Sequence, residues 1–201
     1  PVARSIEFRA CEKPSASALA ALFPGGCVVK PADKGSSVGL SVARDSAGAE
    51  KALSGIESGS WMAEELVKGR EFSIGVIFGR AAGVVEIIPD GGIYDYKRKY
   101  TAGSTRYVYP AEIPERAASA MRAAAEGAFR ACGCRDFARV DFIAADADRP
   151  DFAILEINTL PGMTPTSLLP KSASCAGYSF ESLCETLVGG AVKRFLARTK
   201  R

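Results

Sequence analysis

The chain has 201 residues, 47% hydrophobic and 24% charged, which is enough to bury the core of one medium domain or two small lobes. It contains no histidine, so Ser-His and Cys-His catalysis and histidine-ligated zinc are excluded. No apolar run approaches the roughly 18 residues of a membrane-spanning helix, and the start at Pro1 carries no signal-peptide pattern. We therefore expect a fragment or processed chain without a membrane span.

The positive charge is concentrated at the C-terminal end. The last nine residues, KRFLARTKR, carry five cations and no acid, and removing these five from the net charge of +3 leaves −2 for the rest. This balance does not indicate a nucleic-acid partner for the body of the chain. The tail itself is open to two interpretations, a contact with RNA or a membrane, or a solvated helix end whose cations favour the helix dipole.

The six cysteines form no C-x-x-C pair, so a structural zinc site is not indicated. A chain of this size needs no disulfides, which favours reduced thiols and a cytoplasmic location. Cys27 and Cys184 lie in apolar surroundings and are expected in the core. The cysteines are Cys11, Cys27, Cys132, Cys134, Cys175 and Cys184.

The first third of the chain alternates short helices and strands. In chain order, the pattern predicts a helix over 14–23, a turn at 24–26, a strand over 27–30, a glycine-serine loop over 33–39, a strand over 40–43 and a helix over 46–57. The two strands are expected to form a hairpin.

The remainder predicts strands broken by single helices, which is typical of an α+β fold with mixed or antiparallel sheets. Residues 90–110 are aromatic and cationic without a clear period, as expected of a lid or binding loop. The other predicted elements are strands over 61–67, 71–79 and 83–89, a helix over 114–132, strands over 137–145 and 152–158, and a last helix from residue 179.

Two predicted strands near the C-terminus carry the most informative polar residues. Side chains alternate along a strand, so Arg139 and Asp141 share one face, and Glu156 and Asn158 share a face of the next strand. If the strands pair, a cation and three oxygen ligands converge, and a buried carboxylate pair requires a neutralising partner. Magnesium or manganese suits these oxygens, while an exposed Arg139–Glu156 salt bridge is the alternative.

A second group lies in KPADKGSSVGLS (30–41). The amides of Gly35, Ser36 and Ser37 can form a concave anion site, with Lys30 supplying positive charge. The loop lies between two strands and does not have the Walker pattern. An ordinary hairpin turn uses the same residue types, so this alternative stays open.

Two further segments fit a nucleotide. The strand ending in Glu64, Glu65, Leu66 and Val67 offers a backbone that could pair with a purine edge, and Glu71 follows a turn. The 90–110 segment holds Lys97, Arg98, Lys99 and Tyr100, whose cations could close over phosphates. An ordinary hairpin and a solvated basic loop are the respective alternatives.

Five strings occur in the order in which a known family has them. They are VVKPADKGSSVGLS, EELVKGREFSIGV, IYDYKRKYTAGSTRYVYPA, FARVDF and LEINTLPGMTPTSLLP. Together they resemble the ATP-grasp fold and, more narrowly, the D-alanine–D-alanine ligase family. This resemblance implies two α/β lobes that grip ATP between mixed or antiparallel sheets, a small lobe over 1–68 and a large lobe over 69–201 with the lid at 90–110.

The resemblance also implies roles for individual residues. Lys30 and Ser37 would hold phosphates, Glu64, Glu65, Leu66 and Val67 would hold adenine, Glu71 the ribose, and Lys99 the γ-phosphate. Asp141, Glu156 and Asn158 would bind two Mg²⁺ (or Mn²⁺). Arg139 would stabilise the transferring phosphate. Ser36 and Tyr100 would close the substrate pocket, and Gly162, Ser167 and Leu168 would hold the substrate end.

The implied activity is ATP-dependent joining of two D-alanines through an acyl phosphate, for cell-wall peptidoglycan. Departures from the family are Pro165-Thr166-Ser167 in place of Ser-His-Ser, Lys97-Arg98 in the lid, and the missing N-terminal lobe with its substrate glutamate and a further lysine. Two alternatives follow, another ATP-grasp carboxylate–amine ligase or an inactive nucleotide-binding fragment. The resemblance implies D-alanine and ATP as partners, no nucleic acid or membrane, and a homodimer for the full-length protein.

Overall fold

The structure is a computed structural model that describes residues 1–35, 38–89, 105–149 and 151–199. The chain divides into two compact units, and it passes from one to the other between Lys68 and Gly69, between Ile88 and Pro89, and between Thr105 and Arg106. The smaller unit contains Val2–Lys68, and the larger contains Gly69–Ile88 and the chain from Arg106 onward.

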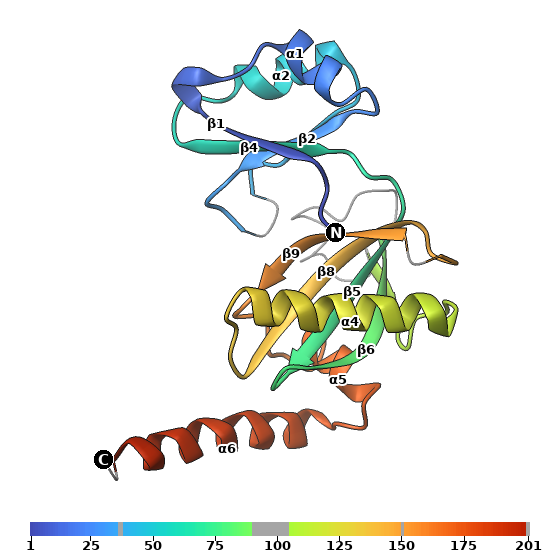
Figure 1. Cartoon of the computed structure of the whole chain (residues 1–201), viewed down its shortest axis with the longest axis vertical. Coiled ribbons are helices and arrows are strands. Elements are labelled where there is room, and N and C mark those ends of the chain that lie inside the picture. The colour runs from blue at the N-terminus through green and yellow to red at the C-terminus, as the bar shows by residue number, and fades with distance from the viewer. Residues whose placement is uncertain (36–37, 90–104, 150, 200–201) are drawn as a thin grey trace. The chain divides into compact units, whose positions relative to one another are not determined.

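The smaller unit is a four-stranded antiparallel sheet with helices packed on it (Figure 1). The strand order is β1-β4-β2-β3, and the predicted 27–30/40–43 hairpin is confirmed as β2–β3. The elements are β1 (Ser5–Arg9), a 3-10 turn (Ala10–Glu12), α1 (Ala16–Leu22), β2 (Cys27–Pro31), β3 (Ser41–Ala43), α2 (Ser46–Ser54) and β4 (Ser60–Glu65).

Side chains that alternate between the two faces of each strand place apolar residues in the core of this unit. Along β2, Cys27 and Val29 are buried and alternate with half-buried residues, so one face meets the helices. Leu19 of α1 and Leu53 of α2 complete the cluster. Both helices begin at a side-chain cap, since Ser15 Oγ accepts from Ala18 N at 3.1 Å and the Asp45 carboxylate accepts at the start of α2.

The larger unit is a five-stranded sheet in the order β7-β6-β5-β8-β9. The pairs β5–β6, β5–β8 and β8–β9 are antiparallel. The elements are β5 (Arg70–Ile77), β6 (Arg80–Pro89), β7 (Thr105–Val108), α4 (Glu115–Ala131), β8 (Phe137–Asp146), β9 (Asp151–Asn158), α5 (Leu168–Ser174) and α6 (Phe180–Thr199).

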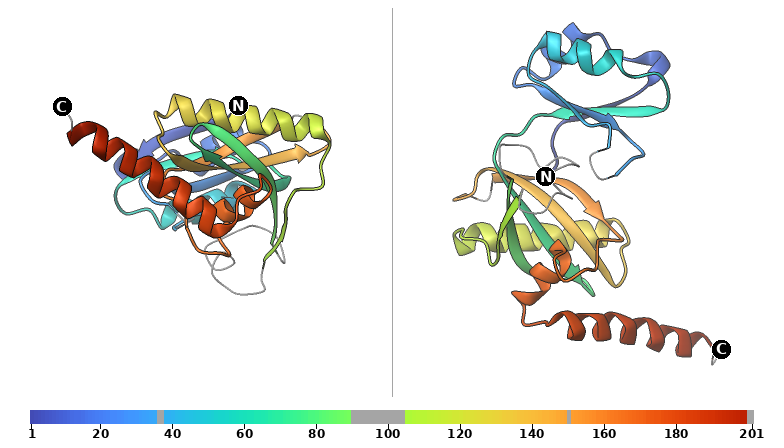
Figure 2. Two further views of the ribbon diagram at one scale, coloured as in Figure 1. Left: turned by 90° about the horizontal axis from the view of Figure 1, so that it is seen from below. Right: turned by 180° about the vertical axis from the view of Figure 1, so that it is seen from behind.

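Different helices pack on the two faces of this sheet (Figures 1 and 2). One face packs against α4 through a core that includes Phe72, Met121 and Phe142. The other face meets α5 and the start of α6 through Ile77, Leu169, Ala173 and Leu183. Strand alternation therefore leaves Arg139 and Asp141 on the α5 side.

Helix α5 approaches the sheet closely because two glycines admit it. A Cβ at Gly75 would lie 2.5 Å from Leu169 Cδ1, and one at Gly83 would lie 2.1 Å from Cys175 Cβ. The β5–β6 register shifts between Ile74 and Val76. At that irregularity Ser172 Oγ accepts from Gly75 N at 2.8 Å and donates to Gly83 O.

Several expectations about secondary structure were wrong. Strand β1 and helix α5 were not predicted, because β1 is a short edge strand with charged residues and α5 contains Pro170 within a Ser/Thr-rich stretch. The proposed 90–110 loop includes a strand, β7, and residues 90–104 lie outside the described residues. Helix α2 ends at Ser54, before Gly55, and not at residue 57.

Two cysteine placements also differ from expectation. Cys132 is exposed because α4 ends at Ala131 and Cys132 is its C-cap, although the predicted helix ran to residue 132. Cys184 is only half-buried in α6, whereas Cys27 is buried as expected. Among the described residues, no helix is both long and apolar enough to cross a membrane.

Candidate functional site

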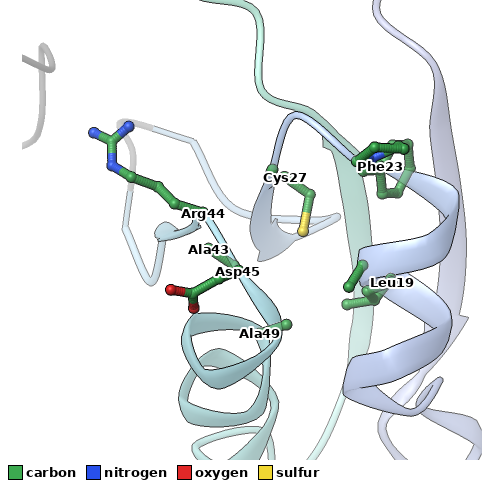
Figure 3. A pocket seen from close by; sticks show the side chains of 10 residues that line it. Leu19, Phe23, Cys27, Ala43, Arg44, Asp45 and Ala49 are labelled. Atoms are coloured by element: carbon green, nitrogen blue, oxygen red, sulfur yellow. The ribbon is translucent and has the colours of Figure 1, made fainter.

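A small pocket lies between α1, α2 and the β2–β3 hairpin (Figure 3). It is lined mainly by apolar groups, including Leu19, Phe23 and Cys27, and its volume is about 40 Å³. Burial raises the pKa of the Cys27 thiol, so this sulfur stays protonated near neutral pH. A space of this size holds little more than a water molecule. The pocket contains none of the residues that the sequence assigns to a nucleotide.

The predicted polar cluster of the larger unit is assembled by strand pairing. Across β8–β9, Arg139 lies opposite Asn158, and Asp141 lies opposite Glu156. Across β5–β8, Asp141 lies opposite Ser73. The pairing that alternation predicted is therefore present, and the side chains come from three neighbouring strands.

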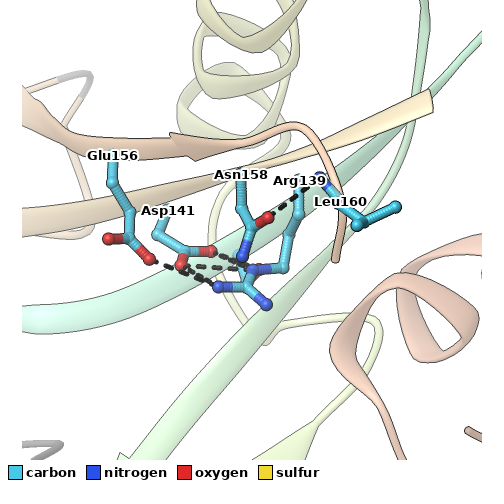
Figure 4. A network of polar contacts seen from close by, with 6 residues as sticks. Arg139, Asp141, Glu156, Asn158 and Leu160 are labelled. Carbon is cyan, nitrogen blue, oxygen red and sulfur yellow. Dashed lines mark hydrogen bonds and ion pairs between the residues drawn. The ribbon is translucent and has the colours of Figure 1, made fainter. Parts of the chain in front are cut away.

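Arg139 and Asp141 form the centre of the network (Figure 4). Arg139 Nε donates to Asp141 Oδ1 at 2.9 Å, and its Nη2 donates to Oδ2 at 2.7 Å. Both side chains are largely buried, with exposed fractions of 12% and 13%. A buried carboxylate requires such a partner, and the bidentate guanidinium supplies the positive charge within the protein itself.

Glu156 and Asn158 lie at the outer side of this centre. Glu156 Oε1 is 3.4 Å from Arg139 Nη2, and its side chain is 42% exposed. Asn158 Oδ1 accepts from Leu160 N at 3.0 Å, which orients the amide. Because Arg139 is mostly buried and binds Asp141 more closely, its contact with Glu156 is not the isolated surface salt bridge of the alternative interpretation.

Ser73 was missed by the sequence analysis. Its hydroxyl is fully buried and donates to Asp141 Oδ1 at 2.7 Å. The signal was available, since Ser73 is a polar residue within the apolar run EFSIGVIF, two positions after Glu71 and hence on the same face. Glu71 lies opposite Ile143 of β8, two positions along β5 from Ser73.

The oxygen donors of this cluster fit a hard divalent cation. Two carboxylates and a carboxamide are ligand types that Mg²⁺ and Mn²⁺ accept. Within the described part of the chain, no group of three or more His, Cys, Asp or Glu side chains is placed to hold a metal. The candidate set therefore consists of Asp141 and Glu156 with Asn158 as its amide member, beside a fixed arginine.

The turn before α5 holds the residues assigned to the substrate end. Ser167 occupies the N-cap position of this helix without a side-chain capping bond, and its Oγ instead accepts from Thr164 N at 3.1 Å and lies 2.7 Å from Thr164 Oγ1. A Cβ at Gly162 would lie 2.9 Å from Ser167 Oγ, so glycine permits this close approach. Leu168 is buried.

Lys171, one turn into α5, contacts both the turn before this helix and strand β7. Its ammonium donates to Thr166 O and lies 5.1 Å from the ring centroid of Tyr107 and 5.8 Å from that of Tyr109. Burial lowers the pKa of Lys171.

Two residues of the smaller unit that the resemblance assigns to the nucleotide, Lys30 and Glu64, form an ion pair with each other. Lys30 Nζ lies 2.7 Å from Glu64 Oε1, and both side chains are largely buried. Glu65 instead pairs with Arg4 at 3.0 Å, and this guanidinium lowers the pKa of the exposed Glu65 carboxyl. The residues assigned to phosphate and to adenine are therefore neighbours in this sheet.

The amides at the end of β4 are already engaged. Leu66 N donates to Gly26 O at 3.0 Å, and Val67 N donates to Glu65 O at 3.0 Å. A purine paired through either of these N–H groups would have to replace an existing bond. Ser36, Ser37, Lys99 and Tyr100, with Lys97 and Arg98, lie outside the described residues.

A family model and the sequences of known proteins both indicate similarity to D-alanine–D-alanine ligases. Residues 6–189 match the family model described as D-ala D-ala ligase C-terminus. The chain is 50% identical over 167 residues to a D-alanine–D-alanine ligase of Anaeromyxobacter sp. (strain Fw109-5). These matched residues make up 82% of this chain and 54% of that protein. The chain thus spans about half the length of the curated relatives it matches.

Two solved structures are similar over nearly the whole chain. A D-alanine–D-alanine ligase from Bacillus anthracis complexed with ATP has a TM-score of 0.77 at 27% identity, covering 96% of this chain and 61% of that one. The VanG D-Ala:D-Ser ligase from Enterococcus faecalis has a TM-score of 0.79 at 27% identity, covering 94% and 56%.

Proposed function

The chain belongs to the D-alanine–D-alanine ligase C-terminus family, and on that premise we propose that it is the ATP-binding and catalytic part of a ligase joining two D-alanines. Its fold is the predicted α+β ATP-grasp fold. The observation that carries the proposal is the buried Arg139–Asp141 pair with Glu156 and Asn158 beside it. This pair lies in a chain that is 50% identical to such a ligase over 167 residues.

The reaction has two steps. The carboxylate of the first D-alanine attacks the γ-phosphorus of ATP, the bond to the β,γ-bridging oxygen breaks, and ADP leaves. The amine of the second D-alanine then attacks the acyl carbon of the acyl phosphate, loses a proton and expels inorganic phosphate. Because the substrates supply both nucleophiles, the protein is required mainly to position groups and stabilise charge.

Arg139 is suited to the charge that develops on the transferred phosphoryl group. Its guanidinium is held by Asp141 and stays charged at any working pH, so little reorganisation is needed when an anion forms beside it. Ser73 holds Asp141 from the opposite strand and so acts as a positioning residue. Gly162, Ser167 and Leu168 would hold the substrate end.

Asp141, Glu156 and Asn158 would hold Mg²⁺, with Mn²⁺ as a substitute. A bound divalent cation supplies charge neutralisation for the ATP phosphates. The oxygen-only donor set, with no histidine in the chain, is what supports this assignment.

Roles in nucleotide binding are proposed for residues of each unit in turn. Lys30 and Ser37 would contact phosphates, Glu64, Glu65, Leu66 and Val67 would surround adenine, and Glu71 would bind the ribose. Lys99 would contact the γ-phosphate, while Ser36 and Tyr100 would close the substrate pocket. Lys30 Nζ lies 2.7 Å from the Glu64 carboxylate, so a phosphate bound by this ammonium would have to compete with Glu64.

The family resemblance also supports a role in cell-wall peptidoglycan synthesis in the cytoplasm, with a homodimeric full-length protein. A second candidate function is favoured by the similarity to a D-Ala:D-Ser ligase, since an ATP-grasp ligase that uses another second substrate would present the same nucleotide site.

The test is D-alanine-dependent release of ADP by this chain with ATP and Mg²⁺. We expect release with D-alanine and none with L-alanine, and D-serine beside D-alanine separates the two candidates. Glu156→Gln should lower turnover at least about a hundredfold, whereas Glu50→Gln, at an exposed site on α2, should not change it. Near-normal turnover by Glu156→Gln would refute the metal assignment. ATP binding without D-alanine-dependent release would instead identify a nucleotide-binding fragment.

A further inference from the structure

Helix α5 is held on the sheet of the larger unit by buried contacts that do not involve its lysine. Ser172 Oγ accepts from Gly75 N and donates to Gly83 O. Leu169 and Ala173, on the same helix, are fully buried, as is Ser172. These contacts account for the docking of α5, so its lysine is available for a different role.

The turn before α5 is held by hydrogen bonds within itself and by that lysine. Ser167 N donates to Thr164 O at 2.9 Å, and Thr164 N donates to Ser167 Oγ at 3.1 Å. Residues 164–166 are exposed. In the part of the chain that the structure describes, the hydrogen bonds that join residues 164–167 to α5 both go to Lys171. Its N donates to Ser167 O at 3.2 Å, and its ammonium donates to Thr166 O.

The ammonium of Lys171 holds one peptide group of this turn. That group joins Thr166 to Ser167, so its oxygen accepts from Lys171 Nζ and its N–H donates to Thr164 O. Because a peptide group is planar, bonds at both its oxygen and its nitrogen fix its orientation. They thereby fix the backbone of Ser167, which carries the hydroxyl assigned to the substrate end.

Lys171 is itself oriented by two aromatic rings. Its nitrogen lies 5.1 Å from the ring centroid of Tyr107 and 5.8 Å from that of Tyr109, within the range of a cation–π contact. No acidic side chain among the described residues forms an ion pair with it. A helix favours cations at its C-terminal end, whereas this side chain runs back toward the N-terminal end of α5. The carbonyl and the rings, and not the helix dipole, therefore explain its position.

We propose that Lys171 is a positioning residue for D-alanine: it fixes the peptide group before Ser167 and so holds Ser167 and Leu168 in the geometry that binds the substrate end. The inference rests on the proposed function, in which these two residues contact the substrate. Lys171 acts through the turn, so its loss should weaken the binding of D-alanine and leave the rate of phosphoryl transfer nearly unchanged.

Three variants test this role. Lys171→Met keeps the length and apolar stem of the side chain and removes its hydrogen-bond donor. Lys171→Arg keeps a charged donor that also stacks on aromatic rings, so it should behave like the native chain. Lys51→Met makes the same chemical change as Lys171→Met at an exposed position on α2 and serves as the control. Circular dichroism of each variant checks that the helices are retained.

Amide hydrogen exchange, followed by NMR without substrate, tests the turn directly. In Lys171→Met, the Thr164 and Ser167 amides should exchange at least about tenfold faster than in the native chain, because a charged hydrogen bond to the turn is lost. The Gly75 amide, which is bonded to Ser172 of the same helix, should exchange as in the native chain. Equal acceleration at Gly75 would overturn the proposal, since Lys171 would then only hold the helix.

The binding of D-alanine is measured with ADP and Mg²⁺ present, so that no γ-phosphoryl group can be transferred. The shifts of the Ser167 and Leu168 amide signals during the titration give the Kd. Lys171→Met should raise this Kd at least about tenfold, the equivalent of one hydrogen bond to a charged group. Lys171→Arg and Lys51→Met should bind D-alanine like the native chain.

Steady-state release of ADP separates this inference from the proposed function. Lys171→Met should raise the KM for D-alanine at least about tenfold, with kcat within about twofold of native and the KM for ATP unchanged. A native chain that binds D-alanine but releases no ADP would refute the proposed activity of this chain. The series of Kd values then decides the role of Lys171 without turnover.

Four further results would overturn the proposal. One is a native chain that does not bind D-alanine, and another is a native Kd for Lys171→Met. The third is a Kd for Lys171→Arg as high as that of Lys171→Met, which would mean that a charged donor is not what the turn requires. The fourth is a lower kcat for Lys171→Met with an unchanged KM for D-alanine, which would assign this lysine to the chemical step.

Discussion

Replacing Ser73 with alanine removes one hydroxyl from the polar network and leaves the rest of it in place. The hydroxyl donates to an ionised carboxylate at 2.7 Å, and both residues are buried. A hydrogen bond to a charged group contributes about 1.5–3 kcal/mol. Asp141 keeps its bonds from Arg139, so no acceptor is stranded, and we expect the lower end of that range.

A loss of about 1.5 kcal/mol corresponds to a fall of roughly 3–6 °C in the unfolding temperature of a protein of this size. Thermal unfolding followed by far-UV circular dichroism measures it. The single tryptophan, Trp61, lies in β4 of the smaller unit, so its fluorescence follows the other part of the chain. The control is Ser119→Ala on the exposed side of α4, where loss of a surface contact with Glu115 should change stability by less than about 0.5 kcal/mol.

The reasoning would be refuted if Ser73→Ala unfolded within about 1 °C of the native chain, since this would mean that the buried hydroxyl contributes no more than a surface one. An equal shift for Ser73→Ala and Ser119→Ala would refute it as well.

Three further predictions concern packing and protonation. Gly83→Ala should cost about 1–3 kcal/mol in urea unfolding because its Cβ meets Cys175, whereas Gly127→Ala, with open space in α4, should stabilise by about 0.5–1 kcal/mol. Burial lowers the pKa of Lys171 in the folded protein, so between that lowered pKa and 10.5 the unfolded chain binds more protons and the free energy of unfolding rises with pH. Lys171→Met should remove this rise. Cys27 should react with iodoacetamide at pH 8 at least about tenfold more slowly than the exposed cysteines, as judged by mass spectrometry; equal rates would contradict its burial.

The regular elements with a clear period were predictable from local pattern. The helix at Glu115–Ala131 and the strands that carry Arg139 and Glu156 follow from spacing alone, because periods of 3.6 and 2 reflect which side of an element is buried. Strand β1 and helix α5 were missed, since an edge strand bearing charges and a short helix containing proline carry little local signal.

The candidate site was predictable in part for the same reason. Alternation placed Arg139 with Asp141 and Glu156 with Asn158, but it does not state which strands become neighbours. The role of Ser73 depended on β5 pairing with β8, two strands separated in the chain by β6, β7 and α4.

The sequence by itself determined the family, the oxygen-only chemistry of the polar cluster and the alternation that gathers it on one face, because these depend on residue identity and short spacing. Only the tertiary structure decided that Arg139 neutralises Asp141, that Lys30 pairs with Glu64 and that Val188 and Phe195 of α6 are exposed. Those facts depend on which distant segments pack together, and the free energy of that packing is summed over many contacts that no local pattern contains.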